Sequence, residues 1–574
     1  MQHNFLLAKL GREARNRLRV PLHPNTERAT LSIIQSTILF RHGDRSPSFN
    51  IYEPDIVKAS HEAFAWAAEL PSDATLADLE SFAPTRRNNI SERPRDAELG
   101  SFGRLSRVGV HQAHDLGSWL SGFYTPSINS TISITSSNYA RTIATAQAVV
   151  RSFLPGDTPK GCFQVQVHDP TTEYLNVYPF FTALQQKMLE LTKKGWFQDF
   201  DQTVVHERQR LESLLPTFSF HLRKFSWLTC QDHFRCRDLR RDQHWSGIPK
   251  SIDGKTWKDS WLHEESLESL RAAFEAGDDN YNGMLSKPEL TRVVHKLLPK
   301  SMIGVSEIDT LYETLKSNSD SNTNTNGVGT GVGVDVGAKN QEVPEEDIGV
   351  SWDDFAQLVG DGLPHLSELK DEEELWTLRP VVEEYTIKRF GMWYNDSDVL
   401  SMATSGLVDA LVDCQNKATQ FFDNNSSSSN SSNSSNSSNS SNSNSNSSNS
   451  SSRIVGGSNI DIGYGRGAVQ YNLMCGHDVT ILPLLHLLGA KREANQWPGY
   501  CCVLIIELMR DADEGEYYVR VLWHPGRTSV GHDDTDDYCR PLLLRQNDDF
   551  MGEECITLDE FRKLTKGEYF GEVR

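Results

Sequence analysis

The chain has few cysteines and no long apolar run, and each absence excludes a class of protein. Nine cysteines are scattered over 574 residues, an odd number that argues against a disulfide framework and for reduced thiols. A membrane-spanning helix needs about 18 consecutive apolar residues. The longest apolar stretch, residues 481–488, is much shorter and contains Pro483 and His486. We therefore expect no stable membrane insertion.

Basic residues are too few for several kinds of partner. The sequence has 57 Lys and Arg against 78 Asp and Glu, a net charge of −21. Nucleic acids and anionic membranes attract proteins with an excess of Lys and Arg, so neither is an expected partner. A small anionic substrate is compatible with this charge if it binds in a locally basic pocket. The oligomeric state does not follow from the sequence.

The first 20 residues are basic but lack the apolar core of a secretory signal, so we expect no secretion. A mitochondrial presequence and a frayed basic terminus both stay open. The expected location is therefore cytoplasmic or mitochondrial.

The length favours more than one domain, and two low-complexity stretches interrupt the chain. Residues 424–452 are only Ser and Asn, which cannot form a core, so we expect a disordered loop there. Residues 317–340 form a second inserted stretch. The expected parts are an N-terminal extension at 1–30, a main domain in two segments at 31–255 and 365–574, and an insertion at 256–364.

Outside these stretches, strand-like and helix-like patterns alternate. This predicts an α/β fold with a central, mostly parallel sheet flanked by helices. The stretch from about 180 to 415 is mostly helical in pattern and is expected to form a cap beside the sheet. The expected strands lie at 31–40, 132–135, 469–474, 502–508 and 517–523, and the expected helices at 108–120, 142–153 and 479–488.

Residues 41–47, Arg-His-Gly-Asp-Arg-Ser-Pro, directly follow the first expected strand. Ligands of open α/β sheets bind beyond the carboxyl ends of the strands. Arg41, His42 and Arg45 would repel one another in a simple turn, but guanidinium groups match the oxygens of a phosphate dianion. Gly43 allows close approach of the backbone. Taken alone, a solvated basic turn is an equally good interpretation.

Two further junctions between a strand and a helix carry similar chemistry. Arg141 follows the strand at 132–135, and His477 and Asp478 follow the strand at 469–474. Each junction opens a helix, whose N-terminus adds partial positive charge. Taken separately, Asp478 is more simply a helix cap and Arg141 an exposed side chain. We predict that the three junctions converge on one edge of one sheet.

Together these segments resemble the histidine acid phosphatases, branch 2 of the histidine phosphatase superfamily. The Arg-His-Gly-x-Arg-x-Pro pattern is complete at 41–47. Residues 105–117 are similar to the family's Leu-Thr-x-x-Gly-x-x-Gln-x-x-x-Leu-Gly helix. Residues 141–147 resemble the segment that carries the third phosphate-binding arginine, and residues 475–480 resemble the His-Asp motif.

The resemblance covers roughly residues 31–250 and 365–570. Within the family, the run from 477 to 489, with residues 497–498 and 555–561, is most similar to lysophosphatidic acid phosphatases. Phosphatases of inositol and sugar phosphates share the core motif, so those substrates stay open.

The resemblance implies a phosphomonoesterase of the acid phosphatase type. His42 would attack phosphorus and form a phosphohistidine intermediate. Asp478 would protonate the leaving alcohol and then activate water. No metal or cofactor is required for this chemistry. The phosphate oxygens would be bound by Arg41, Arg45, Arg141 and His477.

Residues 278–289 fit the twelve-residue loop of a calcium-binding EF-hand. Hard oxygen ligands at this spacing suit Ca²⁺. Gly283 allows the sharp turn, and apolar residues recur at helical spacing on both sides. An acidic helix–loop–helix linker is the alternative. The expected ligands are Asp278, Asn280, Asn282, the backbone carbonyl of Met284, Ser286 and Glu289.

Because EF-hands usually pair, we expect a second one. Residues 308–315 and 355–359 repeat the apolar spacing of the flanking helices, and Val350 falls at the apolar position of the loop. The stretch 317–340 expands this loop, so we expect the second hand to be degenerate and not to bind calcium. The pair would be inserted in the cap, with calcium in a structural or regulatory role.

A different class of function is a calcium-binding adaptor whose phosphatase domain is inactive. The sequence speaks against it, because His42, three arginines and the His477–Asp478 pair are all present.

Overall fold

The protein is represented by a computed structural model. It describes residues 31–51, 62–63, 66–87, 94–96, 99–126, 130–169, 172–215, 218, 224–238, 251–252, 255–256, 271, 274–275, 278, 284–297, 312–313, 350–351, 372–430, 469–526, 539–544 and 554–567. Several expected features lie outside these residues. They are the extension at 1–30, the stretch 317–340, Asn280, Asn282, the helix at 355–359 and most of the helix at 308–315.

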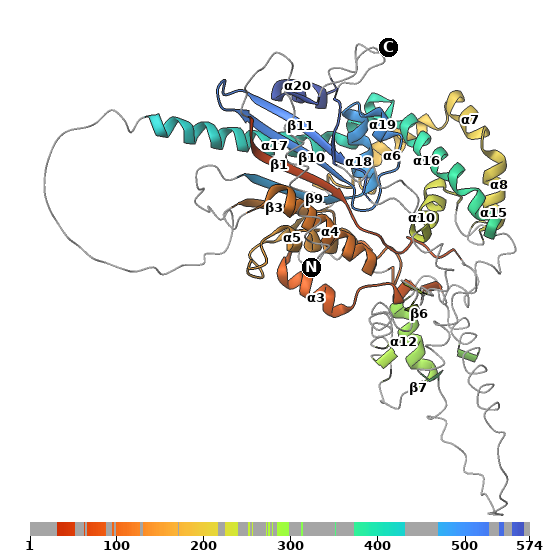
Figure 1. Ribbon diagram of the computed structural model, residues 1–574. Helices are drawn as coiled ribbons and strands as arrows, with labels where there is room; N and C mark the ends of the chain where they lie inside the picture. The colour runs from red at the N-terminus through yellow and green to blue at the C-terminus, as the bar shows by residue number, and fades with distance from the viewer. Residues whose placement is uncertain are drawn as a thin grey trace, which may run out of the picture.

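A sheet with the strand order β12-β11-β10-β1-β9-β3-β4-β2 runs through the main domain, and β13 pairs with β11 (Figure 1). All five strands expected from the sequence are present, as β1, β3, β9, β10 and β11. The strands are β1 (Leu31–Arg41), β2 (Thr85–Arg87), β3 (Thr131–Ser136), β4 (Val165–Val167), β9 (Gln470–Gly476), β10 (Val503–Asp511), β11 (Tyr517–His524), β12 (Arg540–Pro541) and β13 (Cys555–Thr557).

The prediction of a mostly parallel sheet is wrong for one half of it. In the described part of the chain, β1, β9, β3, β4 and β2 pair in parallel. The pairs of β10 with β1, of β11 with β10, and of β12 and β13 with β11 are antiparallel. Residues 512–516 join β10 to β11. This connection is too short for the crossover that a parallel pair needs, so the two strands form a hairpin.

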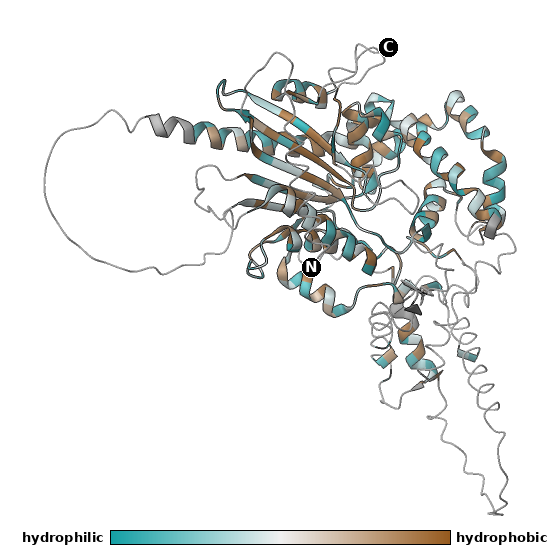
Figure 2. Ribbon diagram, in the orientation of Figure 1, coloured by the Kyte–Doolittle hydropathy of each residue, from teal (hydrophilic) through white to brown (hydrophobic). Residues whose placement is uncertain are grey.

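Helices cover both faces of the sheet. Side chains of β1 reach two cores: Ile38 and Phe40 pack with helices α3, α4 and α5, while Leu39 packs with α17, α18 and α20. A register shift between Ile33 and Gln35 places Ile34 in the same core as Leu39. Figure 2 shows largely hydrophobic strands between helices with hydrophilic outer faces. The helices are α3 (Asp73–Phe82), α4 (Arg107–Tyr124), α5 (Ala140–Phe153), α17 (Ser397–Asn430), α18 (Asp478–Leu487) and α20 (Leu558–Thr565).

The cap is helical, as predicted, and lies beside one end of the sheet (Figure 1). Aromatic side chains fill its core, where Trp227 and Phe234 of one helix pack with Trp376 and Tyr385 of two others. No helix within the described ranges is both long and apolar enough to span a membrane. The cap helices are α6 (Thr182–Leu191), α7 (Gly195–Gln202), α8 (Val205–Leu214), α10 (Trp227–Asp238), α15 (Glu372–Thr377) and α16 (Arg379–Tyr394).

The Ser/Asn tract begins as helix, which corrects the expected loop at 424–452. Helix α17 extends to Asn430, and the rest of the tract lies outside the described residues. The preceding part of α17 is anchored by buried side chains such as Leu407 and Leu411. Adding a residue to an existing helix is far easier than nucleating one, so the anchored helix continues into the polar tract.

Short elements of the expected EF-hand pair lie apart from the sheet (Figure 1). β7 (Met284–Leu285) is followed by α12 (Lys287–Leu297) and pairs with β8 (Val350–Ser351). Leu285 lies opposite Val350 in this antiparallel pair, and both are fully buried. The apolar loop positions expected for the two hands therefore face each other.

Candidate active site

The carboxyl ends of three neighbouring parallel strands meet at one edge of the sheet. Arg41 of β1 lies opposite Gly476 of β9, and Ser136 of β3 lies opposite Cys475 of β9. The segments that follow these strands therefore come together, which confirms the predicted convergence.

The loop after β1 is held by close backbone contacts with α4. A Cβ on Gly43 would lie 2.4 Å from the carbonyl oxygen of Gly109, and one on Gly109 would lie 2.1 Å from that of Asp44. Neither position can hold a larger residue without moving the loop. The backbone N–H of Asp44 donates to Gln112 Oε1 over 2.8 Å. Gly109 and Gln112 belong to the motif at 105–117, and here they seat the loop that carries His42.

His42 is buried with one ring nitrogen engaged. Nδ1 lies 2.8 Å from the carbonyl oxygen of Gly43 and donates to it, which leaves Nε2 without a proton and available for attack. Burial lowers the pKa of His42 well below 6.5, and the charges of Arg141, Arg41 and Arg45 lower it further. The ring is therefore neutral, which is the form a nucleophile needs.

Arg41 and Asp478 form an ion pair at the same edge. Arg41 Nη2 lies 2.8 Å from Asp478 Oδ2, and Arg41 Nη1 donates to the carbonyl oxygen of Pro498 over 2.6 Å. Trp497 Nε1 also donates to Asp478 Oδ2, over 3.1 Å. Two donors therefore orient the Asp478 carboxylate at the start of α18.

Arg141 and His477 lie side by side in the same buried site. Arg141 Nη2 lies 3.5 Å from His477 Nδ1, while Arg141 Nη1 donates to Asp96 Oδ2 and to the carbonyl oxygen of Gly103, each over 3.3 Å. Because Nδ1 accepts from the guanidinium, Nε2 carries the ring proton and donates to Ser137 Oγ over 2.8 Å. Burial and then the neighbouring arginines lower the pKa of His477 well below 6.5. This ring is therefore a neutral hydrogen-bond donor.

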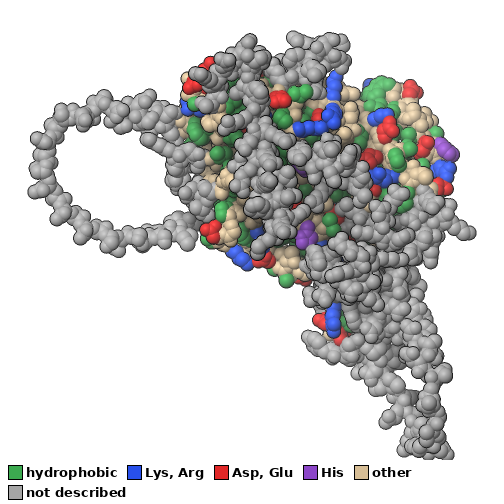
Figure 3. Space-filling model, viewed as in Figure 1, with side chains coloured by type: hydrophobic (Ala, Val, Ile, Leu, Met, Phe, Trp, Pro, Cys, Tyr) green, Lys and Arg blue, Asp and Glu red, His purple; other side chains and the backbone are tan. Residues whose placement is uncertain are grey.

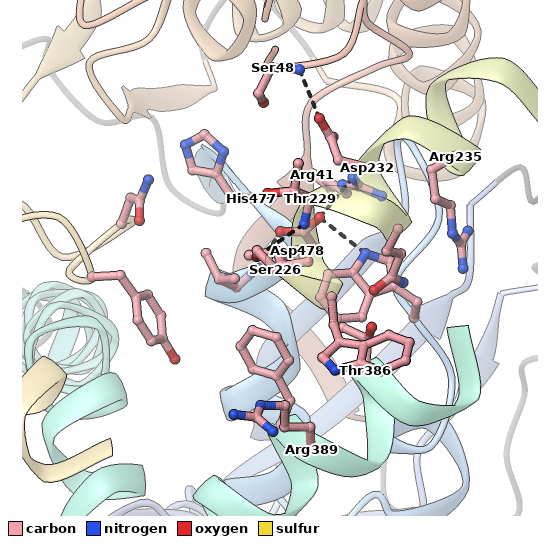
Figure 4. Close-up of a pocket in the computed structure, with 18 of the residues that line it drawn as sticks. Arg41, Ser48, Ser226, Thr229, Asp232, Arg235, Thr386, Arg389, His477 and Asp478 are labelled. Carbon is pink, nitrogen blue, oxygen red and sulfur yellow. Dashed lines mark hydrogen bonds and ion pairs between the residues drawn. The ribbon is translucent and has the colours of Figure 1, made fainter. Parts of the chain in front are cut away.

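Arg45 is held by a carboxylate from the cap. Both terminal nitrogens of Arg45 donate to Asp232 of α10, and the backbone N–H of Ser48 donates to Asp232 Oδ2 over 2.8 Å (Figure 4). Burial opposes the charge of Arg45, but Asp232 outweighs it and raises the pKa of the guanidinium. No sequence pattern points to Asp232, because α10 is distant in the chain and is not amphipathic. Asp232 is thus a residue that fixes one arginine of the site.

A cavity of about 540 Å³ opens over this edge. All six residues expected to bind phosphate or act on it line the cavity, and cap residues line most of the rest (Figure 4). Seen from outside, the described part of the cap bears interspersed acidic, basic and apolar side chains (Figure 3). The six residues are Arg41, His42, Arg45, Arg141, His477 and Asp478. The expected calcium ligands that are described, Asp278, Met284, Ser286 and Glu289, are absent from this lining.

The family model described as Histidine phosphatase superfamily (branch 2) matches residues 32–302. This segment is therefore similar to the histidine phosphatase superfamily. His477 and Asp478 lie beyond the match and reach the site through β9, which pairs with β1.

No curated protein matches the chain. Among solved structures, a phytase from Klebsiella sp ASR1 is 12% identical, with 93% of this chain and 96% of that chain covered and a TM-score of 0.33. A multiple inositol polyphosphate phosphatase from Bifidobacterium longum, in complex with inositol hexasulfate, is 11% identical, with 94% and 93% covered and a TM-score of 0.36. Scores this low carry no argument about fold or substrate.

Replacing Asp232 by alanine is expected to destabilise the protein. The Arg45 and Asp232 side chains are only 9% and 13% exposed, so the variant leaves a buried charge without its partner, at a cost of about 3 kcal/mol in the free energy of unfolding. Inorganic phosphate should restore part of this loss, because it supplies a new anion for Arg45. Urea unfolding with and without phosphate measures both effects.

The matched control is Asp559→Ala, which removes an ion pair with Arg562. The Asp559 carboxylate is 83% exposed. Exposed ion pairs contribute about 0–1 kcal/mol, so losing this one should lower the free energy of unfolding by only about a few tenths of a kcal/mol. Equal losses in the two variants, or no response to phosphate, would contradict the role of Asp232.

Proposed function

We propose that the protein is a phosphomonoester hydrolase of the acid phosphatase type that acts through a phosphohistidine intermediate. The observation that carries the proposal is the free Nε2 of a neutral His42 in a cavity that Arg41, Arg45, Arg141 and Asp478 also line. A neutral nucleophile, cations that match phosphate oxygens and a carboxyl group that can carry a proton are the parts this reaction needs. The histidine phosphatase match supports the same chemistry.

In the proposed first step, His42 Nε2 forms a bond to phosphorus and the bond from phosphorus to the ester oxygen breaks. Asp478 gives its proton to the departing alkoxide. The step requires Asp478 in its protonated form, which the second step regenerates. In the second step, Asp478 takes a proton from water, which attacks the phosphohistidine and releases inorganic phosphate.

We propose a monoester with an apolar leaving group, with lysophosphatidic acid as the leading candidate. The cap contributes aromatic and aliphatic side chains to the cavity, and Leu228 at its rim is 43% exposed. Such a lining removes apolar surface of a bound chain from water. Sugar and inositol phosphates are the alternative. The apolar cap residues are Met188, Phe225, Trp227, Leu228, Phe390 and Trp393.

The test is phosphate release from p-nitrophenyl phosphate between about pH 4 and 7, the range expected for this acid–base pair. A panel of lysophosphatidic acid, a hexose phosphate and an inositol monophosphate follows. We expect hydrolysis of the aromatic ester and the highest kcat/KM with the lipid. A folded protein that hydrolyses nothing, with calcium added or chelated, overturns the proposal and favours the adaptor function. Equal kcat/KM across the panel overturns only the lipid preference.

We also propose that the loop 278–289 binds calcium. Asp278 and Glu289 are 7% and 5% exposed, and the amide and hydroxyl of Ser286 both donate to Glu289 Oε2. The loop is thus closed by its last carboxylate, and β7 joins it to β8. The described residues contain no cluster of three His, Cys, Asp or Glu side chains that could hold a metal. An EF-hand fits this finding, because its other ligands are amide, hydroxyl and backbone oxygens.

Calcium is expected to raise the melting temperature of the wild type, since a ligand at 100 times its Kd stabilises by about 2.7 kcal/mol. Glu289→Gln should abolish this shift, because it removes the bidentate carboxylate. Glu275→Gln, which changes a 63% exposed side chain, is the control and should keep the shift. Identical calcium titrations of the wild type and Glu289→Gln would rule out this site. Calcium dependence of turnover separates a regulatory role from a structural one.

A further inference from the structure

Helix α10 turns one face toward the cavity. Leu228, Gln231, Asp232 and Arg235 recur at i, i+3, i+4 and i+7, and all four line the cavity. Leu228 lies exposed at the rim, while Asp232 and Arg235 are held in ion pairs. Gln231 lies on the same face, between these groups.

The amide of Gln231 is buried and makes no hydrogen bond in the described structure. The residue is 2% exposed, and neither Oε1 nor Nε2 has a partner. Burying an amide without partners is costly, so buried amides are normally satisfied by protein, water or ligand. Two hydroxyls of the same cavity lining have other partners: Ser226 Oγ accepts from the N–H of Thr229, and Thr386 Oγ1 donates to the carbonyl of Val382. Gln231 therefore keeps both its donor and its acceptor for a ligand.

We propose that Gln231 binds a free hydroxyl group of the leaving alcohol and makes the enzyme specific for hydroxylated phosphomonoesters. This inference rests on the phosphomonoesterase function proposed above. A hydroxyl both donates and accepts, so one such group satisfies Oε1 and Nε2 together. Gln231 lines the same cavity as the residues proposed to bind phosphate, and it directly precedes Asp232, which holds Arg45. Glycerol phosphates and lysophosphatidic acid carry a hydroxyl close to the ester and belong to the expected class.

A substrate without the hydroxyl displaces water and leaves the amide unpaired. Sites built to bind a substrate hydroxyl discriminate strongly against analogues that lack it. We expect wild-type kcat/KM for glycerol 3-phosphate to exceed that for n-propyl phosphate by about 10- to 100-fold. The two esters have the same carbon chain and differ only in hydroxyl groups.

The experiment measures this ratio in the wild type, in Gln231→Met and in Gln415→Met. Methionine keeps the length and flexibility of glutamine without its amide. Gln415 of α17 is the matched control, because it is also 2% exposed with both amide atoms unpartnered, but it does not line the cavity. We expect the ratio to fall close to one in Gln231→Met and to stay at the wild-type value in Gln415→Met.

The possible outcomes separate the two proposals. A wild-type ratio near one overturns the role of Gln231, and this measurement does not depend on whether any variant folds. A high ratio that survives in Gln231→Met also overturns it. If the folded wild type hydrolyses neither ester nor p-nitrophenyl phosphate, the phosphatase function itself fails, and the inference fails with it.

Discussion

His42→Ala is expected to lower kcat for p-nitrophenyl phosphate by about 10⁴-fold or more, the size of loss seen when a covalent nucleophile is removed. Nδ1 donates to Gly43, so Nε2 is the nitrogen that can attack, and alanine has no substitute for it. The lowered pKa of His42 keeps the ring neutral at pH 6.5, so wild-type kcat/KM should not fall near that pH, where an ordinary histidine takes up its proton.

The control for this variant is His114→Ala. His114 is a half-buried histidine of α4 that bonds Ser152 Oγ over 2.8 Å and lies outside the cavity lining. It should keep near wild-type kcat. Alkaline quenching of the wild type during turnover with a ³²P-labelled monoester should trap label on the protein, because phosphohistidine is stable in alkali, and His42→Ala should trap none. Comparable turnover in the wild type and His42→Ala would refute the histidine mechanism.

The sequence could predict the three junctions of the site because parallel strands place their carboxyl ends at one edge. Arg41, Arg141 and His477 each follow a strand with a strong β pattern, so their meeting required only that the strands share a sheet. Gly109 and Gln112 belong to a recognisable motif, but a motif does not indicate which segment its residues contact, and in the structure they contact the loop after β1.

Other features could not be predicted, for different physical reasons. Asp232 and Gln231 lie on α10, whose polar and apolar residues do not alternate with a helical period because ion pairs bury much of its charge. The antiparallel half of the sheet depended on the short turn at 512–516. The helix at 424–430 continues from the preceding part of α17, which is held in place by tertiary contacts. The composition of a Ser/Asn tract does not reveal such contacts.

The charges of the site explain why its arginines can be buried without substrate. Arg41 pairs with Asp478, Arg45 with Asp232 and Arg141 with Asp96. Buried cations need such partners. Of the three carboxylates, Asp478 and Asp232 line the cavity, and Asp478 directly follows His477 at the edge of the sheet. Asp478 is thus the carboxyl placed to exchange a proton with the leaving group.

Asp478→Asn is expected to reduce turnover in a way that depends on the leaving group. Asparagine keeps the shape of the side chain, and its amide oxygen can still accept hydrogen bonds from Trp497 and Arg41. It has no carboxyl proton to transfer to the leaving group. An alkoxide needs that proton, so kcat/KM for glycerol 3-phosphate should fall by about 10²- to 10⁴-fold, the usual contribution of a general acid. A nitrophenolate leaves without a proton, so the loss of kcat/KM for p-nitrophenyl phosphate should be much smaller.

The ratio of these two losses separates the two roles that the ion pair allows. If Asp478 acts only by holding Arg41, its replacement weakens phosphate binding equally for both esters, and the ratio stays at the wild-type value. If Asp478 is the general acid, the ratio shifts by about tenfold or more against the alkyl ester. Asp232→Asn is the matched comparison, because it also removes a carboxylate that pairs with an arginine of the cavity. It should lower kcat/KM for the two esters by the same factor. A leaving-group effect equal in both variants would remove Asp478 from the proton-transfer step.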